Sequence, residues 1–566
     1  MSLSSIDIAV VVVYLAGITF LGIYVAGRIK DLSQFIMPRR FGKAMMIMHT
    51  FGTGTHSDQA VGVASKTFTN GLSGIWYQWL WLFVTPFYWI IAPLMRRFRA
   101  DTTADVFEAR YDRGVAVLFA AVGMLHLSTN IGVMLRGSGE VLNAVVGNWV
   151  SLEILILFMT LLFVAYGVAG GLSAAIVTDF VQGILTIIFS FLLLPFILDA
   201  VGGIAGLHEK ISDPQMFSLV APAEIGVFYV LVIAFNGLVG WVTQPHNMGL
   251  SAAGKTEMEG RIGTVGGSFV KRFCTIAWCL TGLAAVVYFA GRGIHPDRVY
   301  GRAASEFLPK IMPGLLGVFV ASLLASVMSS CDSFMIASSG LFTENIYKPL
   351  APGKNPAHYL RVARAMSLVV VAGGVVYAFW LPDVVKGIEI FWKIGSMMGI
   401  AFWMGLFWRR ATPAGAWAST LTAFFAWWLT TRAGFVDFVS TLPVSETLRL
   451  TIEKSGGIEI YLPWQMLFYL AGGLIAGVAV SLATKPVDRG KLENFYALTR
   501  TPVKEGEKQQ KSCVLPEGIE AAPKNNLVSR WGLEIQKPSV ISVVGFAASW
   551  AVVALIIYIF VAIARA

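Results

Sequence analysis

Long apolar runs, separated by short polar or basic segments, occupy most of the chain. A helix that crosses a lipid bilayer needs about 20 predominantly apolar residues, and the sequence contains about fourteen runs of this kind. They lie near residues 6–27, 44–69, 75–95, 115–146, 150–170, 173–199, 226–248, 264–290, 313–346, 364–381, 387–408, 413–432, 461–483 and 539–563. The pattern predicts an all-α integral membrane protein with about 14 transmembrane helices.

The composition agrees with this class. Of the 566 residues, 56% are hydrophobic and only 13% are charged, about half the charged fraction of a typical soluble domain. The net charge of +10 indicates basic cytoplasmic loops rather than nucleic-acid binding. The cysteines are too few and too scattered for a disulfide framework, and they indicate no redox or zinc site. They are Cys274, Cys279, Cys331 and Cys513.

Lysine and arginine concentrate in alternate loops, which predicts the orientation. The basic set covers residues 28–43, 96–113, 348–364 and 409–410, and above all 485–537. The loops of the opposite set contain almost no lysine or arginine. The exception is one loop that contains Arg292, Arg298, Arg302 and Lys310. Because basic loops stay in the cytoplasm, we expect a multi-pass protein of the cell membrane with both termini outside the cytoplasm. The first run lacks a signal-peptide cleavage site, so we expect it to stay as a helix.

The same pattern suggests a division of the chain. Residues 1–43 would form an extra N-terminal helix and a basic cytoplasmic loop, and residues 44–432 a transport core of spans 2–12. Residues 433–483 would hold span 13. A polar stretch at 484–538 is typical of a cytoplasmic linker without catalytic function, and a peripheral helix at 539–566 would follow it.

Glycines and hydroxyl residues interrupt the second run. Gly52, Thr53, Gly54 and Thr55 stand in mid-membrane, and His56, Asp58 and Gln59 follow at once. Such a stretch indicates an unwound joint, whose freed carbonyls can coordinate a cation. The alternative is close helix packing through small residues. The adjacent ionisable side chains favour the joint, because ionisable residues inside a span usually face a cavity or a partner.

A second interrupted span lies five spans later. In the run 226–248, Gly237 and Gly240 precede Gln244, Pro245 and His246. Two interrupted spans in corresponding positions predict an inverted five-helix repeat, with spans 2–6 as the first copy and spans 7–11 as the second. No sequence similarity between the two halves supports the repeat, so it rests on the interruptions and the topology.

The ninth run is rich in hydroxyl groups. Four serines recur at spacings of three and four residues beside Asp332, namely Ser326, Ser329, Ser330 and Ser333. Hydroxyl and carboxylate oxygens suit a hard cation. Serines in membrane helices also bond back to their own helix, and that interpretation suffices for Ser338 and Ser339. It does not explain the carboxylate.

Other ionisable residues lie inside the predicted spans. Asp179 follows Thr178 near the inner end of the sixth span, where it could also be a helix-end residue that reaches cytoplasmic water. Two pairs of opposite charge are spaced four residues apart, so each could be an internal ion pair near an outer gate or a solute contact. They are Arg136 with Glu140 and Glu389 with Lys393.

At these residues the chain resembles the sodium:solute symporter family, which includes sodium/glucose, sodium/proline and sodium/sialic acid transporters. The resemblance covers roughly residues 6–483. Its motifs are AYGVAGGLSAAIVTDFVQG at 165–183, GWVTQPHNM at 240–248 and ASVMSSCDSFMIASSGLFTENIY at 325–347. It implies a LeuT-like 5+5 inverted-repeat core with extra N- and C-terminal helices.

The resemblance also implies ion ligands. The main sodium site would use the carbonyls of Gly52, Thr55 and Ser326 and the hydroxyls of Ser329 and Ser330. A second ion site, present in some members, would use three side chains: Asp179, Asp332 and Ser333. The sequence departs from the family at Asp332, where a small hydroxyl or apolar residue is usual, and at Gly54, where some members have a polar side chain.

The resemblance places a solute cavity at mid-membrane between spans 2, 3, 4, 7 and 11. The candidate side chains are His56, Asp58, Gln59, Gln78, Asn130 and Asn236. Asp58 and the histidines favour a cationic or zwitterionic solute, whereas Arg136 and Lys393 favour a carboxylate. An amino acid, a monocarboxylate, a sugar and a urea-like compound therefore all remain open.

The sequence thus predicts a sodium-coupled secondary active symporter that imports a small polar organic solute by alternating access, with Na⁺ as the coupling ion. The nearest alternative is proton coupling through His56, Asp179 or Asp332. An uncoupled channel or a sensor with the same fold is a further alternative. A membrane enzyme built on His49, His56, Asp58 and His126 is disfavoured, because no metal-ligand spacing accompanies these residues.

Overall fold

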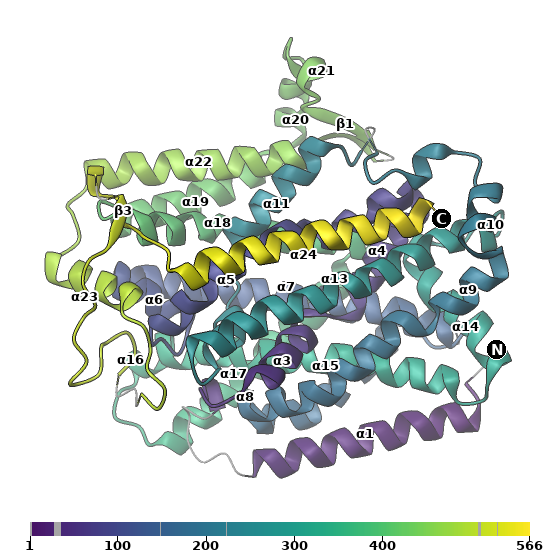
Figure 1. Ribbon diagram of the computed structural model, residues 1–566, viewed down its shortest axis with the longest axis horizontal. Coiled ribbons are helices and arrows are strands. Elements are labelled where there is room, and N and C mark those ends of the chain that lie inside the picture. The colour runs from purple at the N-terminus through teal and green to yellow at the C-terminus, as the bar shows by residue number, and fades with distance from the viewer. Residues whose placement is uncertain are drawn as a thin grey trace.

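Helices make up nearly all of the computed structural model, and the long ones run side by side along the longest axis of the molecule (Figure 1). The structure describes residues 3–27, 35–147, 149–221, 224–454, 456–507, 511–528 and 530–565. Arg28 and Lys30, which belong to the first predicted basic loop, lie outside the described residues.

The first half of the chain contains one broken helix and one kinked helix. The helices are α1 (Ser5–Ala26), α3 (Lys43–Gly54), α4 (Ser57–Asn70), α5 (Trp76–Arg97), α6 (Thr103–Arg110), α7 (Arg113–Val145), α8 (Leu152–Leu192), α9 (Leu194–Val201) and α10 (Gly203–Lys210). The kink in α8 lies at Gly171, whose φ of 58° favours glycine. A Cβ at this position would lie 2.5 Å from the Phe35 ring, so the predicted boundary between spans 5 and 6 falls at a glycine with no room for a side chain.

The second half begins with another broken helix. Its helices are α11 (Val227–Trp241), α12 (Asn247–Ala252), α13 (Glu257–Tyr288), α14 (Val299–Ile311), α15 (Leu315–Phe342), α16 (Lys348–Leu350), α17 (Pro356–Trp380), α18 (Val384–Phe407), α19 (Pro413–Leu429), α20 (Ala433–Ser440), α21 (Ser445–Leu448), α22 (Leu462–Ala483), α23 (Arg489–Arg500) and α24 (Val540–Arg565). Two short antiparallel hairpins join β1 (Thr451–Lys454) to β2 (Gly457–Ile460) and β3 (Asn526–Val528) to β4 (Ile535–Gln536).

Every predicted apolar run falls on a helix, which confirms the all-α class. Ten helical stretches of the described chain are long and apolar enough to cross a membrane, and Leu152–Ala165 and Val227–Trp241 are shorter apolar helices. The exact number of fourteen spans therefore stays a prediction.

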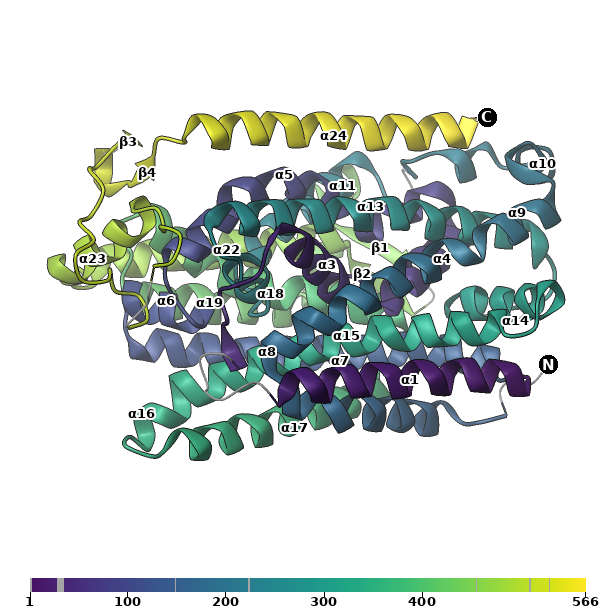
Figure 2. The same ribbon diagram turned by 60° about the horizontal axis from the view of Figure 1, so that its bottom comes forward.

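α15 lies at the centre of the bundle, where it packs against α8, α7, α17, α3 and α1. Its serines and Asp332 are buried. α1 and α24 lie on opposite outer sides (Figure 2), and both carry exposed apolar side chains such as Phe20 and Tyr558. Exposed apolar helices on the outside and polar groups in the centre are the arrangement expected for a protein whose solvent is a lipid bilayer.

The segment between α22 and α24 folds back onto one end of the bundle, near α6 and α16, whereas both chain termini lie at the opposite end (Figure 1). The fully buried side chain of Arg99 binds this segment. Its guanidinium donates to both carboxylate oxygens of Glu507 at 2.5 and 2.9 Å, and to the carbonyl of Thr501 at 3.3 Å. The stretch predicted as a linker thus packs tightly against the basic loop between α5 and α6.

We expect Arg99→Ala to release this segment, because removing one partner of a buried ion pair leaves an uncompensated charge that costs about 3–5 kcal/mol. Limited proteolysis of residues 484–538 and thermal unfolding in detergent would both show the loss. Arg292→Ala is the matched control, since Arg292 and Glu306 form a partly exposed pair worth about 0–1 kcal/mol. Equal protease resistance of the two variants would contradict this account.

Candidate functional site

The second span is broken where the sequence predicts a joint. α3 ends at Gly54, and Thr55 and His56 are extended, with φ values of −126° and −132°, before α4 begins at Ser57. Two glycines within four residues weaken the helix by about 1 kcal/mol each relative to alanine. The break leaves main-chain carbonyls without their usual helical partners in the middle of the bundle.

Oxygen atoms from two helices converge at this break. The Ser330 hydroxyl on α15 lies 3.3 Å from the carbonyl oxygen of Gly52, 3.0 Å from that of Thr53 and 3.2 Å from that of Ser326. A hydroxyl has one hydrogen, so it can satisfy only one of these acceptors fully at a time. The Thr55 hydroxyl is buried and has no hydrogen-bond partner among the described residues. The cluster is thus rich in oxygen acceptors and poor in donors.

A buried carboxylate lies beside this cluster. The Ser329 hydroxyl donates to one oxygen of Asp179 on α8. The other oxygen lies 2.6 Å from His49 Nδ1 and 3.2 Å from the Thr53 hydroxyl, which in turn lies 2.8 Å from the Ser333 hydroxyl. Side chains from α3, α8 and α15 therefore form one continuous polar network, which we call the break network: His49, Thr53, Asp179, Ser329, Ser330 and Ser333.

The sequence interpretation missed two members of the break network. The sequence pattern indicated His49 only as part of a disfavoured enzyme site, and Thr53 only as a residue of the joint. The available signal was helical spacing, because His49 and Thr53 are four residues apart on α3 and share a face. Asp332 stays a predicted ligand of the second ion site. A Cβ built on Gly167 of α8 would lie 2.2 Å from its carboxylate oxygen, so Asp332 is packed against that glycine.

A buried lysine reaches the break from a third direction. Lys271 on α13 donates from Nζ to the carbonyl oxygen of Gly54 at 2.5 Å, and its side chain is almost fully buried. A cation is stabilised at the carboxyl end of a helix, which here is the end of α3. No sequence pattern predicted this contact, since Lys271 lies within a long, largely apolar helix and its partner is more than 200 residues away.

The predicted solute residues of the second span form a compact group. His56 Nδ1 contacts the Asp58 carboxylate, and His56 Nε2 lies 2.9 Å from Gln59 Nε2. The group packs against α7, where a Cβ on Gly137 would lie 2.6 Å from the Asp58 Cα. Close helix contact and a polar joint thus occur together, although the sequence presented them as alternatives.

The other predicted solute residues are more dispersed. The Asn236 amide bonds to the Trp392 carbonyl at 3.0 Å and accepts a hydrogen bond from the Tyr469 hydroxyl, so it ties α11 to α18 and α22. Gln78 and Asn130 are buried on α5 and α7, and no hydrogen bond among the described residues joins either to the His56 group. The Gln78 Oε1 atom is buried without a partner in the same part of the chain.

The second predicted interruption is also present, because α11 ends at Trp241 and α12 begins at Asn247. Both breaks face one aromatic ring of α15. The His246 ring lies 4.5 Å from the Phe334 ring centroid and the His56 ring 6.4 Å from it. The two interrupted helices therefore meet around Phe334, next to the break network.

The two pairs of opposite charge spaced four residues apart differ in whether their members contact each other. Arg136 and Glu140 form the predicted ion pair at 3.2 Å, and Glu140 also accepts from Arg298 at 2.9 Å. Glu389 and Lys393 do not pair with each other: Glu389 accepts from the Tyr77 hydroxyl, and Lys393 donates to Gln465 at 2.9 Å. Of the two alternatives left open for 389 and 393, the ion pair is not formed, because each side chain finds a partner on a neighbouring helix.

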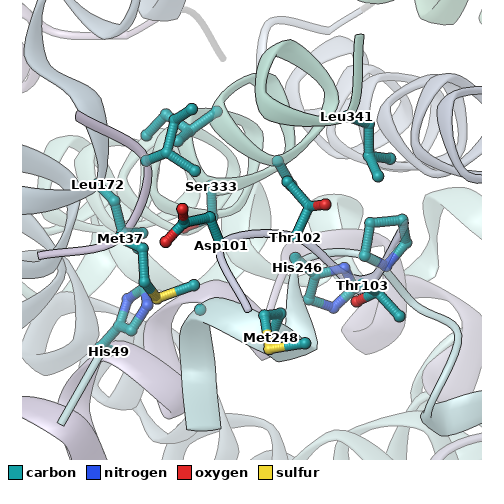
Figure 3. A pocket seen from close by; sticks show the side chains of 15 residues that line it. Met37, His49, Asp101, Thr102, Thr103, Leu172, His246, Met248, Ser333 and Leu341 are labelled. Carbon is teal, nitrogen blue, oxygen red and sulfur yellow. The ribbon is translucent and has the colours of Figure 1, made fainter. Parts of the chain in front are cut away.

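A narrow pocket of about 30 Å³ leads away from the break network (Figure 3). His49, Ser333 and His246 line it together with Asp101 and Thr102 of the loop after α5. Asp101 forms an ion pair with Arg39 at 2.9 Å, and burial raises the pKa of its carboxyl above the ordinary value. The pocket has room for only about one or two water molecules.

One family model matches most of the chain, and several transporters are similar to it in sequence. Residues 35–423 match the model of the sodium:solute symporter family. The sodium/glucose cotransporter of Vibrio parahaemolyticus is 24% identical over 73% of this chain and 83% of the relative. The osmoregulated proline transporter OpuE of Bacillus subtilis (strain 168) is 24% identical over 84% of this chain and 94% of the relative.

Solved structures show the same fold. A Na⁺-coupled sialic acid symporter, in a substrate-bound outward-open state, superposes with a TM-score of 0.71 at 19% identity, over 86% of this chain and 99% of that one. A transporter of the nucleobase-cation-symport-1 family, in a closed conformation, has a TM-score of 0.53 at 9% identity, over 81% and 99% of the two chains. The fold is therefore LeuT-like, as expected.

Two glycines of the break provide a matched test. A Cβ on Gly52 would lie 2.8 Å from the Ser329 hydroxyl, whereas a Cβ on Gly54 meets no atom within 4 Å. We expect Gly52→Ala to destabilise the protein by about 1–3 kcal/mol and to abolish any rise of the unfolding temperature by sodium, and Gly54→Ala to do neither. Thermal unfolding in sodium and in choline measures both effects. Identical behaviour of the two variants would refute the packing argument.

Proposed function

The chain belongs to the sodium:solute symporter family and couples sodium to the transport of a small solute, and we propose that the break in its second span is where the sodium binds. The protein is a transporter rather than an enzyme, and it is a multi-pass protein of the plasma membrane. We further propose which residues bind the ion and the solute, and in which direction the solute moves.

One observation carries the proposal for the ion. Carbonyl oxygens of Gly52 and Ser326 come from different helices, yet both lie within 3.3 Å of the Ser330 hydroxyl. A sodium ion that displaced this hydroxyl slightly would gain several oxygen ligands at once, and hard cations prefer oxygen. The Thr55 carbonyl and the Ser329 hydroxyl complete the proposed main site. The unpartnered Thr55 hydroxyl supports an open ligand position there.

A second ion would bind at the carboxylate. Asp179 and Ser333 are both in contact with Thr53, so they lie close enough to share a ligand. His49 occupies one oxygen of Asp179 and would have to turn away or stay neutral for a cation to bind there. Asp332, which lies against Gly167 of α8, is the third proposed ligand of this site.

Sodium binding at this place would couple to solute transport by linkage. The proposed ion connects α3 to α15, and the polar group that begins with His56 directly follows the proposed ligand Thr55 in the chain. An ion shifts a conformational equilibrium only if it binds one state more tightly than the other. The membrane potential adds about 2.3 kcal/mol per 100 mV for each inward charge. That is sufficient to import a solute against a gradient by alternating access.

We place the small polar organic solute between the two breaks. His56, Asp58 and Gln59 would contact it from one side and His246 with Phe334 from the other. Gln78 and Asn130 are the remaining buried polar candidates, whereas the amide of Asn236 is engaged in helix packing. The Asp58 carboxylate and the Lys271 ammonium both lie near the break, so the site would accept a dipolar solute.

The basic end of the molecule would face the cytoplasm. This orientation follows from the positive-inside rule and puts both termini outside. Residues 44–432 would then form the transport core, with α1 and the part after α19 as additions. The narrow pocket at Asp101 would be the closed route from the break network to the cytoplasm.

Two serine pairs on α15 test the ion site. Ser329→Ala with Ser330→Ala removes two proposed ligands, and we expect sodium-dependent uptake to be lost in a folded protein. Ser338→Ala with Ser339→Ala is the control, because both hydroxyls donate only to carbonyls of their own helix, at Met335 and Ile336. Uptake into proteoliposomes with sodium replaced by choline at fixed pH measures the effect. Uptake that persists in choline and follows a proton gradient would favour the proton-coupled alternative and refute sodium coupling at this site.

A separate variant tests the solute site. Asp58→Asn keeps the shape of the side chain but removes its charge, and a hydrogen bond to a charged group contributes about 1.5–3 kcal/mol. We therefore expect the KM for solute to rise by about tenfold or more, with the sodium dependence retained. The substrate itself can be found by thermal-shift screening of a solute library with and without sodium. An unchanged KM would place the solute away from Asp58.

A further inference from the structure

A large, mainly apolar groove lies beside the start of α24, which contributes Ser542 to its lining. Its volume is about 1250 Å³, compared with about 300–1,000 Å³ for typical small-ligand pockets. It is walled by α5, α11, α18 and α22 and closed at one end by the segment 499–542. A second cavity of about 360 Å³ shares Phe87, Phe235 and Leu238 with it and extends toward Trp550 of α24. We call the two together the α24 groove.

The part of the α24 groove between the helices is apolar. It is lined by leucine, phenylalanine, isoleucine and tryptophan side chains, for example Leu238, Leu470 and Trp403. A water molecule needs two to four polar partners, which these side chains do not offer. In a bilayer, an apolar space of this size beside a peripheral helix is filled by acyl chains.

One end of the groove is basic. Arg261, Arg500 and Lys537 line it, and among the described residues none of the three forms an ion pair. The neighbouring carboxylates are already engaged, since Glu534 binds Arg409 and Glu257 binds Arg97. Three uncompensated positive charges at the mouth of an apolar groove match the chemistry of an anionic phospholipid.

Arg261 gives an independent indication. Its side chain is about 95% buried, and one nitrogen donates to the Ser542 hydroxyl at 3.1 Å. The other terminal nitrogen, Nη1, is buried and has no hydrogen-bond partner in the described part of the chain. The guanidinium lies 5.6 Å from the Trp89 ring centroid, and Trp89 donates to the Ile541 carbonyl at 2.9 Å. The buried Arg261 guanidinium thus lies at the start of α24 and has a nitrogen that donates no hydrogen bond among the described residues.

We propose that the α24 groove binds one anionic phospholipid, whose phosphate lies against Arg261, Arg500 and Lys537 and whose acyl chains lie along α5 and α11 up to Trp550. Basic pockets between membrane helices on the cytoplasmic side are suited to lipid headgroups. The lipid would fill the space between α24 and the bundle and so hold this helix in place. The site is separate from the ion and solute site proposed above.

Native mass spectrometry of the full chain tests the proposal. Protein purified from membranes that contain phosphatidylglycerol and phosphatidylcholine should retain phosphatidylglycerol preferentially. Each basic residue near an anionic lipid changes binding by about fivefold, so Lys537→Gln should lower retention about fivefold, and Arg261→Gln at least as much. Lys537 is exposed and its side chain has no partner among the described residues, so Lys537→Gln does not depend on tolerance of a buried change.

Two further variants separate recognition of the lipid headgroup from recognition of its acyl chains. Lys354→Gln removes an exposed charge of a loop outside the groove and should leave retention unchanged. Leu238→Trp fills the apolar part and should lower retention of both lipids. Equal retention of phosphatidylglycerol and phosphatidylcholine, unchanged retention in Lys537→Gln, or recovery of inorganic phosphate without lipid would each overturn the proposal.

Discussion

The structure depends on how unpaired main-chain carbonyls are satisfied inside a membrane. A helix that stops at Gly54 in mid-bundle leaves acceptors that no lipid can satisfy, and each would cost several kcal/mol if left alone. The protein supplies a hydroxyl from α15 and an ammonium from α13. The hydroxyl satisfies its acceptors only in part, and this is the place where we propose that a cation binds.

The break also determines which helices must stay together. α15 supplies Ser329 to Asp179 of α8 and Ser330 to the carbonyls of α3, so this one helix joins α3 to α8. Phe334 on the same helix lies between the two interrupted spans. A movement of α15 would therefore alter the proposed ion ligands and the proposed solute contacts at once. In the proposed mechanism, α15 is the element that ion and solute share.

Sequence patterns predicted the parts of this arrangement that are local. Glycines and threonines at 52–55 give a break because helix propensity is a property of the segment itself, and the serine spacing of α15 gives a polar face for the same reason. The contact of Lys271 with Gly54 could not be predicted, because it depends on how helices distant in sequence pack. Tertiary packing likewise gave Glu389 and Lys393 separate partners, although their spacing suggested a pair.

The central claim is that sodium binds to main-chain oxygens of the break and hydroxyls of α15. High-resolution maps of the protein in sodium and in choline would test it most directly. The account predicts a compact density peak in sodium, surrounded by the carbonyls of Gly52 and Ser326 and the Ser330 hydroxyl, which disappears in choline. No peak at this place in sodium, or the same peak in choline, would contradict it.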